Sequence, residues 1–276
     1  MRFCPTRLAP ASFLSFLCGV LLQSSLLGAE PITVRYPEGS THGYLAIRTL
    51  DGKLVAAGDS IQTVHGGQLV SRLIYRFKDG SIDEDTAVFT QHGQFRLISD
   101  HRIQRGPTFS KPTDVMIKAT TGEVIVRYKD KGQDKVEISH IDLPPDLSNG
   151  IVLDIVRNLS FDTKETKLSY LAITPKPRLI HLSIQPEGEE TFVSAGMRNK
   201  ALRFKIHVEI GGITGVVAPM VGKEPPDTHV WISAGQVPAF IRSEEPLYYG
   251  GPVLRTELVS PVWPQTPKSE REGQGK

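Results

Sequence analysis

The feature that most constrains the fold is a regular alternation of apolar and polar residues along most of the chain. Between Leu202 and Ile210 every second residue is apolar, and the residues between them are charged or polar. A period of two is typical of a β-strand with one buried and one solvated face. The alternation returns in four further stretches: Leu69, Leu73, Tyr75 and Phe77; Phe95, Leu97 and Ile103; Val124, Val126 and Tyr128; Ile180, Leu182 and Ile184.

Short turn signals separate these stretches. A spacing near ten residues with such turns favours an antiparallel meander over strands that alternate with helices. We therefore predict a mainly β protein in which one continuous curved sheet makes a single domain over residues 30–263. A division into two domains near residue 160 stays open. The turn signals are Asp51-Gly52, Gly66-Gly67, Asp79-Gly80, His92-Gly93 and Thr121-Gly122.

One segment departs from the strand pattern. Leu143-Pro144-Pro145 stops a strand, because proline cannot donate a hydrogen bond to a sheet. The apolar residues that follow, from Ile151 to Leu159, recur at helical spacing. We predict one amphipathic helix near residues 148–159, with Ser148 or Asp146 as its N-cap, packed against or inside the sheet.

The first 29 residues have the layout of a secretory signal peptide. Arg2 and Arg7 precede an apolar run that ends at Leu22, and Gly28-Ala29 provides small residues for cleavage. The run is short for a membrane span, so we expect none once the leader is removed. We predict a periplasmic or secreted protein, with a disordered tail at residues 264–276.

Removal of this leader changes the cysteine count and the charge balance of the exported chain. Both cysteines, Cys4 and Cys18, lie in it, so the exported chain has neither a disulfide nor a thiol nucleophile. Of 32 basic residues the leader holds Arg2 and Arg7, which leaves 30 against 30 acidic residues. A balanced chain with interspersed charges argues against a nucleic-acid partner.

The usual catalytic motifs are absent from the sequence. There is no Gly-x-Ser-x-Gly elbow, no His-Glu-x-x-His helix and no phosphate-binding loop. The glycine-rich stretch at residues 211–215 fits a turn or bulge between strands. The acidic run Asp83-Glu84-Asp85 lacks the spacing of a calcium loop, and we interpret it as a solvated hairpin flank. We therefore predict no enzyme, no cofactor and no metal.

Two histidines and a group of aromatic residues are the candidate ligand-binding residues. His101 is in phase with Leu97 and Ile103, and His140 with Val136 and Ile138, which predicts that both face inward. Inward histidines can act as an acid–base pair, or more simply bond to neighbouring groups in the core. The aromatic candidates gather in the last third, where they line a pocket or fill one end of the sheet: Trp231, Phe240, Tyr248 and Tyr249.

The combined pattern resembles that of uncharacterised bacterial periplasmic β-rich proteins related to the lipoprotein-carrier superfamily. It is carried by Ser71 to Asp100, by Val136 to Leu159, and by the closing segments Val230-Trp231-Ile232-Ser233 and Val237-Pro238-Ala239. The resemblance implies a strongly curved antiparallel sheet, an incomplete barrel, wrapped around a helix or an apolar ligand. It supplies no catalytic residue.

Two functions from different classes follow. The first is an exported non-enzymatic carrier or binding protein for an apolar ligand such as a lipid or acyl chain. The second is a structural or assembly protein of the cell envelope that acts through protein–protein contacts at the edges of its sheet. An enzymatic function would have only His101 and His140 as candidate catalytic residues.

Overall fold

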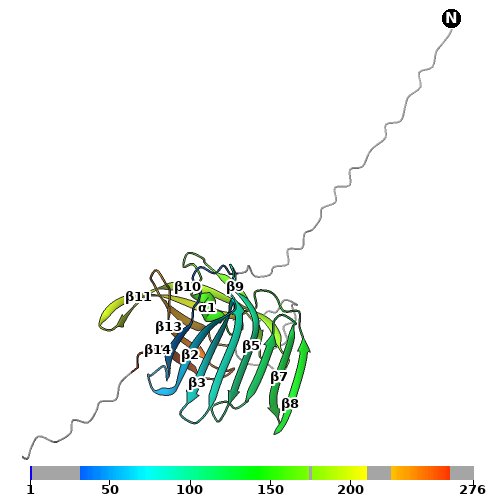
Figure 1. Cartoon of the computed structure of the whole chain (residues 1–276), viewed down its shortest axis with the longest axis horizontal. Helices are drawn as coiled ribbons and strands as arrows, with labels where there is room; N and C mark the ends of the chain where they lie inside the picture. The colour runs from blue at the N-terminus through cyan, green and yellow to red at the C-terminus, as the bar shows by residue number, and fades with distance from the viewer. Residues whose placement is uncertain (2–31, 174–175, 210–224, 262–276) are drawn as a thin grey trace, which may run out of the picture.

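The computed structural model describes Met1 and residues 32–173, 176–209 and 225–261. They form fourteen β-strands and one short helix, α1 (Val152–Val156) (Figure 1). The predicted leader and tail, and the glycine-rich stretch at 211–215, lie outside the described residues. The strands are β1 (Thr41–Thr49), β2 (Leu54–His65), β3 (Gln68–Phe77), β4 (Ile82–Thr90), β5 (Arg96–Arg105), β6 (Thr113–Lys118), β7 (Glu123–Asp130), β8 (Gln133–His140), β9 (Thr166–Ala172), β10 (Arg178–Ser194), β11 (Met197–Glu209), β12 (Thr228–Ser233), β13 (Phe240–Pro246) and β14 (Val253–Val259).

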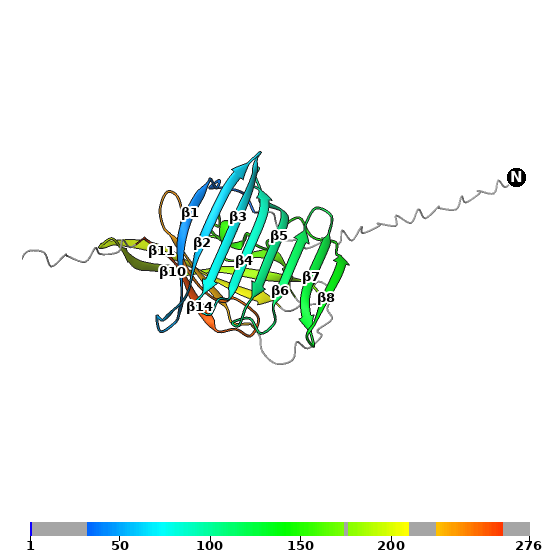
Figure 2. The ribbon, with the colours of Figure 1, turned by 60° about the horizontal axis from the view of Figure 1, so that its bottom comes forward.

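All fourteen strands belong to one antiparallel sheet, which confirms the predicted mainly β fold. The strand order is β8-β7-β6-β5-β4-β3-β2-β1-β14-β13-β12-β11-β10-β9. Two meanders, β1–β8 and β9–β14, therefore meet where β1 pairs with β14, with Tyr44 opposite Val259. The sheet curves round on itself without closing, and β8 and β9 are its two edges (Figures 1 and 2).

The predicted turns lie where the glycines indicated. Gly66 and Gly67 join β2 to β3 with φ of 56° and 82°. A two-residue hairpin of the type whose twist matches the strands requires positive φ at both positions, which glycine adopts without steric cost. Val64 of β2 thus lies opposite Leu69 of β3, and the inward-facing residues of the two strands stay in register.

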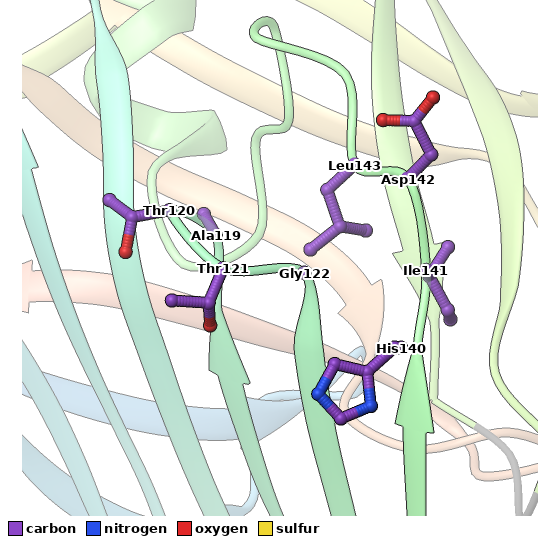
Figure 3. A pocket seen from close by; sticks show the side chains of 8 residues that line it. All are labelled: Ala119, Thr120, Thr121, Gly122, His140, Ile141, Asp142 and Leu143. Atoms are coloured by element: carbon purple, nitrogen blue, oxygen red, sulfur yellow. The ribbon is translucent and has the colours of Figure 1, made fainter.

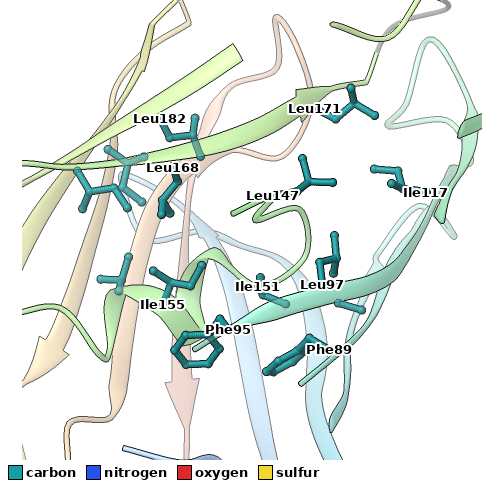
Figure 4. Close-up of a cluster of buried hydrophobic side chains, with 14 of the residues drawn as sticks. Phe89, Phe95, Leu97, Ile117, Leu147, Ile151, Ile155, Leu168, Leu171 and Leu182 are labelled. Atoms are coloured by element: carbon teal, nitrogen blue, oxygen red, sulfur yellow. The ribbon is translucent and has the colours of Figure 1, made fainter. Parts of the chain in front are cut away.

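The concave side of the sheet is filled by a segment of the same chain, residues 146–158, which we call the plug. Leu147, Ile151 and Ile155 of the plug lie between the wall formed by β4–β7 and the wall formed by β9–β12 (Figure 4). Ile151 and Ile155 are 1% and 2% exposed. Burying each contributes about 1.5–3 kcal/mol, so the plug serves as a core for both walls.

The helix in the plug is shorter than predicted. Its α-helical part is Val152–Val156, and neither Ser148 nor Asp146 caps it. Both side chains instead hydrogen-bond to the backbone of β9. Pairing with a strand edge satisfies more buried backbone groups than a cap would, so Leu147 forms a bridge with Ser169 and residues 149–151 form turns before the helix begins.

Candidate functional site

Among the described residues, the gap beside the plug is small. The gap between the plug and the walls, lined by Ile32, Phe95, Leu147 and Leu168 among others, has a volume of about 10 Å³. A larger cavity of about 380 Å³ lies between the turn at residues 119–122 and the strand end at 140–143 (Figure 3). Its lining is mostly polar and includes His140 and Asp142. Neither space has the size and apolar lining that an acyl chain requires.

A layer of charged and polar side chains crosses the interior beyond the plug. Arg102 donates to both carboxylate oxygens of Asp83, at 3.2 and 2.9 Å, and to the backbone carbonyl of Leu247 at 2.9 Å. Gln104 donates to the same carboxylate and the same carbonyl, at 3.0 and 2.8 Å. This network joins β4 and β5 to the end of β13 across the interior. A second apolar cluster lies at that end of the sheet: Leu45, Ile47, Ala56, Tyr75, Phe77, Phe109, Leu247 and Leu254.

Three further acids belong to this layer. Burial, and then the neighbouring Asp85, raise the pKa of Asp100 well above its usual range. The Oδ1 atoms of Asp85 and Asp100 are buried and have no other hydrogen-bond partner. When Asp100 is protonated, it can donate a hydrogen bond to Asp85. Burial also raises the pKa of Glu245, which accepts a hydrogen bond from Ser243. The layer thus combines one buried ion pair with two carboxyl groups, Asp100 and Glu245, whose pKa values are raised by burial.

The interpretation of the acidic run in β4 as a solvated hairpin flank is therefore wrong. Asp83 is 2% exposed and faces inward, and Asp85 lies on the same face, whereas Glu84 faces outward and pairs with Arg72 at 2.7 Å. Because successive residues of a strand point to opposite faces, three adjacent acids divide between the interior and the solvent.

Polar contacts hold the plug against β2 and the segment before β1. Gln62 of β2 donates to Asp154 Oδ1 at 2.6 Å. Arg157 pairs with the buried carboxylate of Glu38 at 2.5 Å. Asn158 Oδ1 also accepts the backbone N–H groups of residues 35 and 36, each at 2.7 Å. The apolar contacts of the plug bury it in the sheet, and these polar contacts fix its orientation.

Asp154 is the group of this contact whose pKa is shifted. Burial, and then the negative charge of Glu38, raise its pKa to about 7, against the opposing effects of Gln62 and Arg157. The folded state therefore binds a proton that the unfolded state releases near pH 4. The free energy of unfolding consequently falls as the pH rises from about 4 to about 7, and this contribution is constant above that range.

We expect Asp154→Asn to remove this pH dependence. Asparagine keeps an oxygen that accepts from Gln62 but carries no ionisable group, so the variant should be more stable than the parent at pH 8 by about 2–4 kcal/mol. The two proteins should differ little near pH 4. Urea unfolding at pH 4.5, 6 and 8 measures this, with Asp162→Asn at an exposed position as the control. Parallel pH profiles for Asp154→Asn and its parent would contradict the assignment.

The prediction that His101 and His140 face inward is wrong. In β5 the register with β4 shifts between Val88 and Phe89, which leaves Ile98 as an extra residue. Such a bulge reverses the phase of the strand, so Asp100 and Arg102 point inward and His101 points outward. His101 Nε2 lies 2.9 Å from Asp114 Oδ1, with 34% of its side chain exposed. His140 is exposed at the end of β8, and Figure 3 shows it beside the cavity described above.

The four aromatic candidates occupy different environments. Trp231 lies on the outer face and is 4% exposed. The guanidinium carbon of Arg242 lies over its ring, 3.9 Å from the ring centroid. Phe240 packs inside against both apolar clusters, and Tyr248 contacts Phe109 edge-on. Tyr249 is 63% exposed. The structure thus does not bring the four together into one pocket, and a ligand-binding role for them stays a prediction.

The two edges of the sheet differ sharply. The edge of β9 is covered by the plug. Ser148 donates from its backbone N–H and from Oγ to the carbonyl of Ser169, and Asp146 accepts the N–H of Ser169. The side-chain amide of Asn149 bonds to both the N–H and the carbonyl of Leu171, at 2.8 and 3.0 Å. Every outward backbone group of these two β9 residues therefore has a partner.

The edge of β8 has no such cover in the described part of the chain. Ile141 donates to the carbonyl of Gly122, so the odd-numbered residues of β8 bond to β7. The even-numbered residues from 134 to 140 then direct N–H and C=O groups away from the sheet. Figure 2 shows β8 as the outermost strand beyond β7. Seven of the eight β8 residues are exposed, among them Val136 at 57% and Ile138 at 61%. We take this edge as the candidate functional site.

Comparison with known proteins adds one structural likeness. No family model matches the chain, and neither does any curated protein. The chain is similar to a solved structure, the beta-barrel-like protein of a domain of unknown function (DUF1849) from Brucella abortus. The match has a TM-score of 0.40 and 10% sequence identity, and covers 84% of this chain and 98% of the other.

The chemistry that the β8 edge offers is hydrogen bonding to an extended backbone. An unpaired edge strand is a template on which a second strand can add, with side-chain pairs giving specificity. Among the described residues, no three His, Cys, Asp or Glu side chains converge on a possible metal position. The same residues contain no helix with the length and hydropathy of a membrane span.

Proposed function

We propose that the protein is an exported, non-enzymatic binding protein of the cell envelope that engages an extended segment of a protein partner along β8. The contrast between the two sheet edges carries the proposal. The chain uses Ser148, Asn149 and Asp146 to cover β9, whereas β8 keeps four residues with outward backbone groups and two exposed apolar side chains. Natural sheets normally protect an edge of this kind, so an edge that the described residues leave uncovered favours a binding role.

The filled interior supports this choice over lipid carriage. A carrier with a preformed site needs an apolar cavity, and the plug occupies that place here. Carriage of a lipid or acyl chain is our second candidate function, favoured by the apolar walls that withdrawal of the plug would uncover. The similarity to lipoprotein carriers likewise stays a prediction. Organic extraction of the natively purified protein, followed by mass spectrometry, tests it, because a stoichiometric lipid would favour the carrier.

Proline at position 136 tests the proposed binding edge. Val136 directs its N–H away from β7, so Val136→Pro removes a donor from the open edge without breaking the pairing with β7. With a photo-crosslinking residue at position 138, we expect a discrete protein adduct in cells that Val136→Pro reduces at least tenfold. Position 193, also exposed on the distant β10–β11 hairpin, should give no such adduct.

Val136→Thr is the matched control, because threonine keeps both the N–H group and a β-branched side chain. It should preserve the adduct. Equal crosslinking in the proline and threonine variants would reject β8 as the binding edge. So would the absence of any protein adduct at position 138 together with a stoichiometric bound lipid.

A further inference from the structure

We infer that the partner which fits the β8 edge is a second copy of this chain, paired antiparallel about a two-fold axis at Val136. This inference rests on the proposed function, since it names the partner of the same edge. The reasons are the direction of the backbone groups in β8, the order of its charges and the position of its exposed apolar residues.

The backbone direction restricts the possible registers. In an antiparallel pair, a residue whose N–H and C=O groups point outward must lie opposite another such residue. A two-fold axis therefore passes through one residue of β8 and its own copy. With the axis at Val136, Val136 lies opposite Val136 of the second copy and the two exchange both backbone hydrogen bonds. Seven residues, 133–139, then overlap.

The charges of β8 select this register. With the axis at Val136, each Lys135 lies opposite a Glu137 of the other copy, which places two opposite-charge pairs on one face. Moving the axis by one residue in either direction would put Glu137 opposite Glu137 or Lys135 opposite Lys135, and like charges directly opposite are destabilising. An axis at Ile138 gives no opposite-charge pair. The strand is thus self-complementary in one register.

The exposed apolar residues lie on the opposite face of the same pairing. Val136 of each copy would contact its counterpart, and Ile138, directly opposite Asp134 of the other copy, would lie diagonally next to its Val136. This covers the side chains that are 57% and 61% exposed in the single chain. Because seven paired residues bury far less than the roughly 1,600 Å² of a typical stable complex, we expect a dimer that depends on concentration.

Charge reversal provides the test. Analytical ultracentrifugation of the purified exported chain should show a monomer–dimer equilibrium. Lys135→Glu and Glu137→Lys should each raise the dissociation constant about tenfold, since each creates two like-charge pairs. The double variant Lys135→Glu/Glu137→Lys restores opposite pairs between identical copies and should return to within about threefold of the parent. Val136→Pro should abolish the dimer, and Val136→Thr should retain it.

The outcomes separate this inference from the proposed function. A monomer at all concentrations, or a double variant as weak as the single ones, would overturn pairing with a second copy. If crosslinking at position 138 then still gave a Val136→Pro-sensitive adduct with a different protein, the binding edge would stand and only its partner would change. A dimer unaffected by Val136→Pro would also overturn the inference, since it would form through another surface.

Discussion

Replacing Arg102 with methionine should lower the free energy of unfolding by about 3–5 kcal/mol, one of the two largest effects that we expect for a single substitution in this chain. The guanidinium is the positive partner of Asp83, which is 2% exposed, and it also satisfies the carbonyl of Leu247. Methionine fills much of the same volume but leaves a carboxylate buried with Gln104 as its remaining donor. Urea unfolding at pH 7, followed by circular dichroism, measures the loss.

Two further variants separate the charge effect from packing. Arg105→Met removes an exposed arginine from the same strand and should cost less than about 0.5 kcal/mol. Asp83→Asn added to Arg102→Met removes the unpaired charge, and should recover about 1–3 kcal/mol of the loss. If the double variant is no more stable than Arg102→Met alone, the polar layer does not depend on this ion pair.

Gly150→Ala should destabilise the protein by about 3 kcal/mol or more, because two costs add at this position. Gly150 has φ of 70°, a region that costs residues with a Cβ about 1–2 kcal/mol. A Cβ there would also lie 2.6 Å from Asp100 Oδ1 and 2.7 Å from Ala87 Cβ. Overpacking of this kind costs about 1–3 kcal/mol. Thermal and urea unfolding at neutral pH measure the total.

Gly93→Ala is the control for the backbone contribution. Gly93 has φ of 71°, and a Cβ placed on it would meet nothing within 4 Å. We expect a loss of about 1 kcal/mol there, so that the difference between the two variants reports how tightly the plug presses on β4 and β5. Equal losses at the two positions would show that the plug can shift away from Asp100.

Local sequence patterns predicted those parts of the fold that depend on local chemistry. Alternation in β11 places Phe204 and Ile206 inward as expected, and the glycine turns lie between the expected strands. The predicted helix lies in the correct segment, because apolar residues at helical spacing need a buried surface on one side. The observed helix is shorter than predicted, because Ser148 and Asp146 bond to a strand that follows them in the chain.

The errors have one physical origin, which is that register and partners are set by distant segments. A single extra residue, Ile98, reverses the face of His101, and the alternation around it gives no sign of this. Asp83 and Asp85 become interior residues because Arg102 lies on the neighbouring strand. The candidate site at β8 has a similar limit. Its sequence indicates a strand, but only the sheet order makes it an edge.

The position of β14 has a consequence for how the chain can fold. The last strand of the described chain lies in the middle of the sheet, between β13 and β1. The first eight strands can form a meander as soon as they are available, yet β1 has no neighbour on its other side until the end of the chain arrives. Contacts of such high sequence separation slow folding and prolong the lifetime of partly folded chains with open edges. We therefore expect slow folding whose last step is the meeting of the two ends, with truncation before residue 253 leaving an aggregation-prone intermediate.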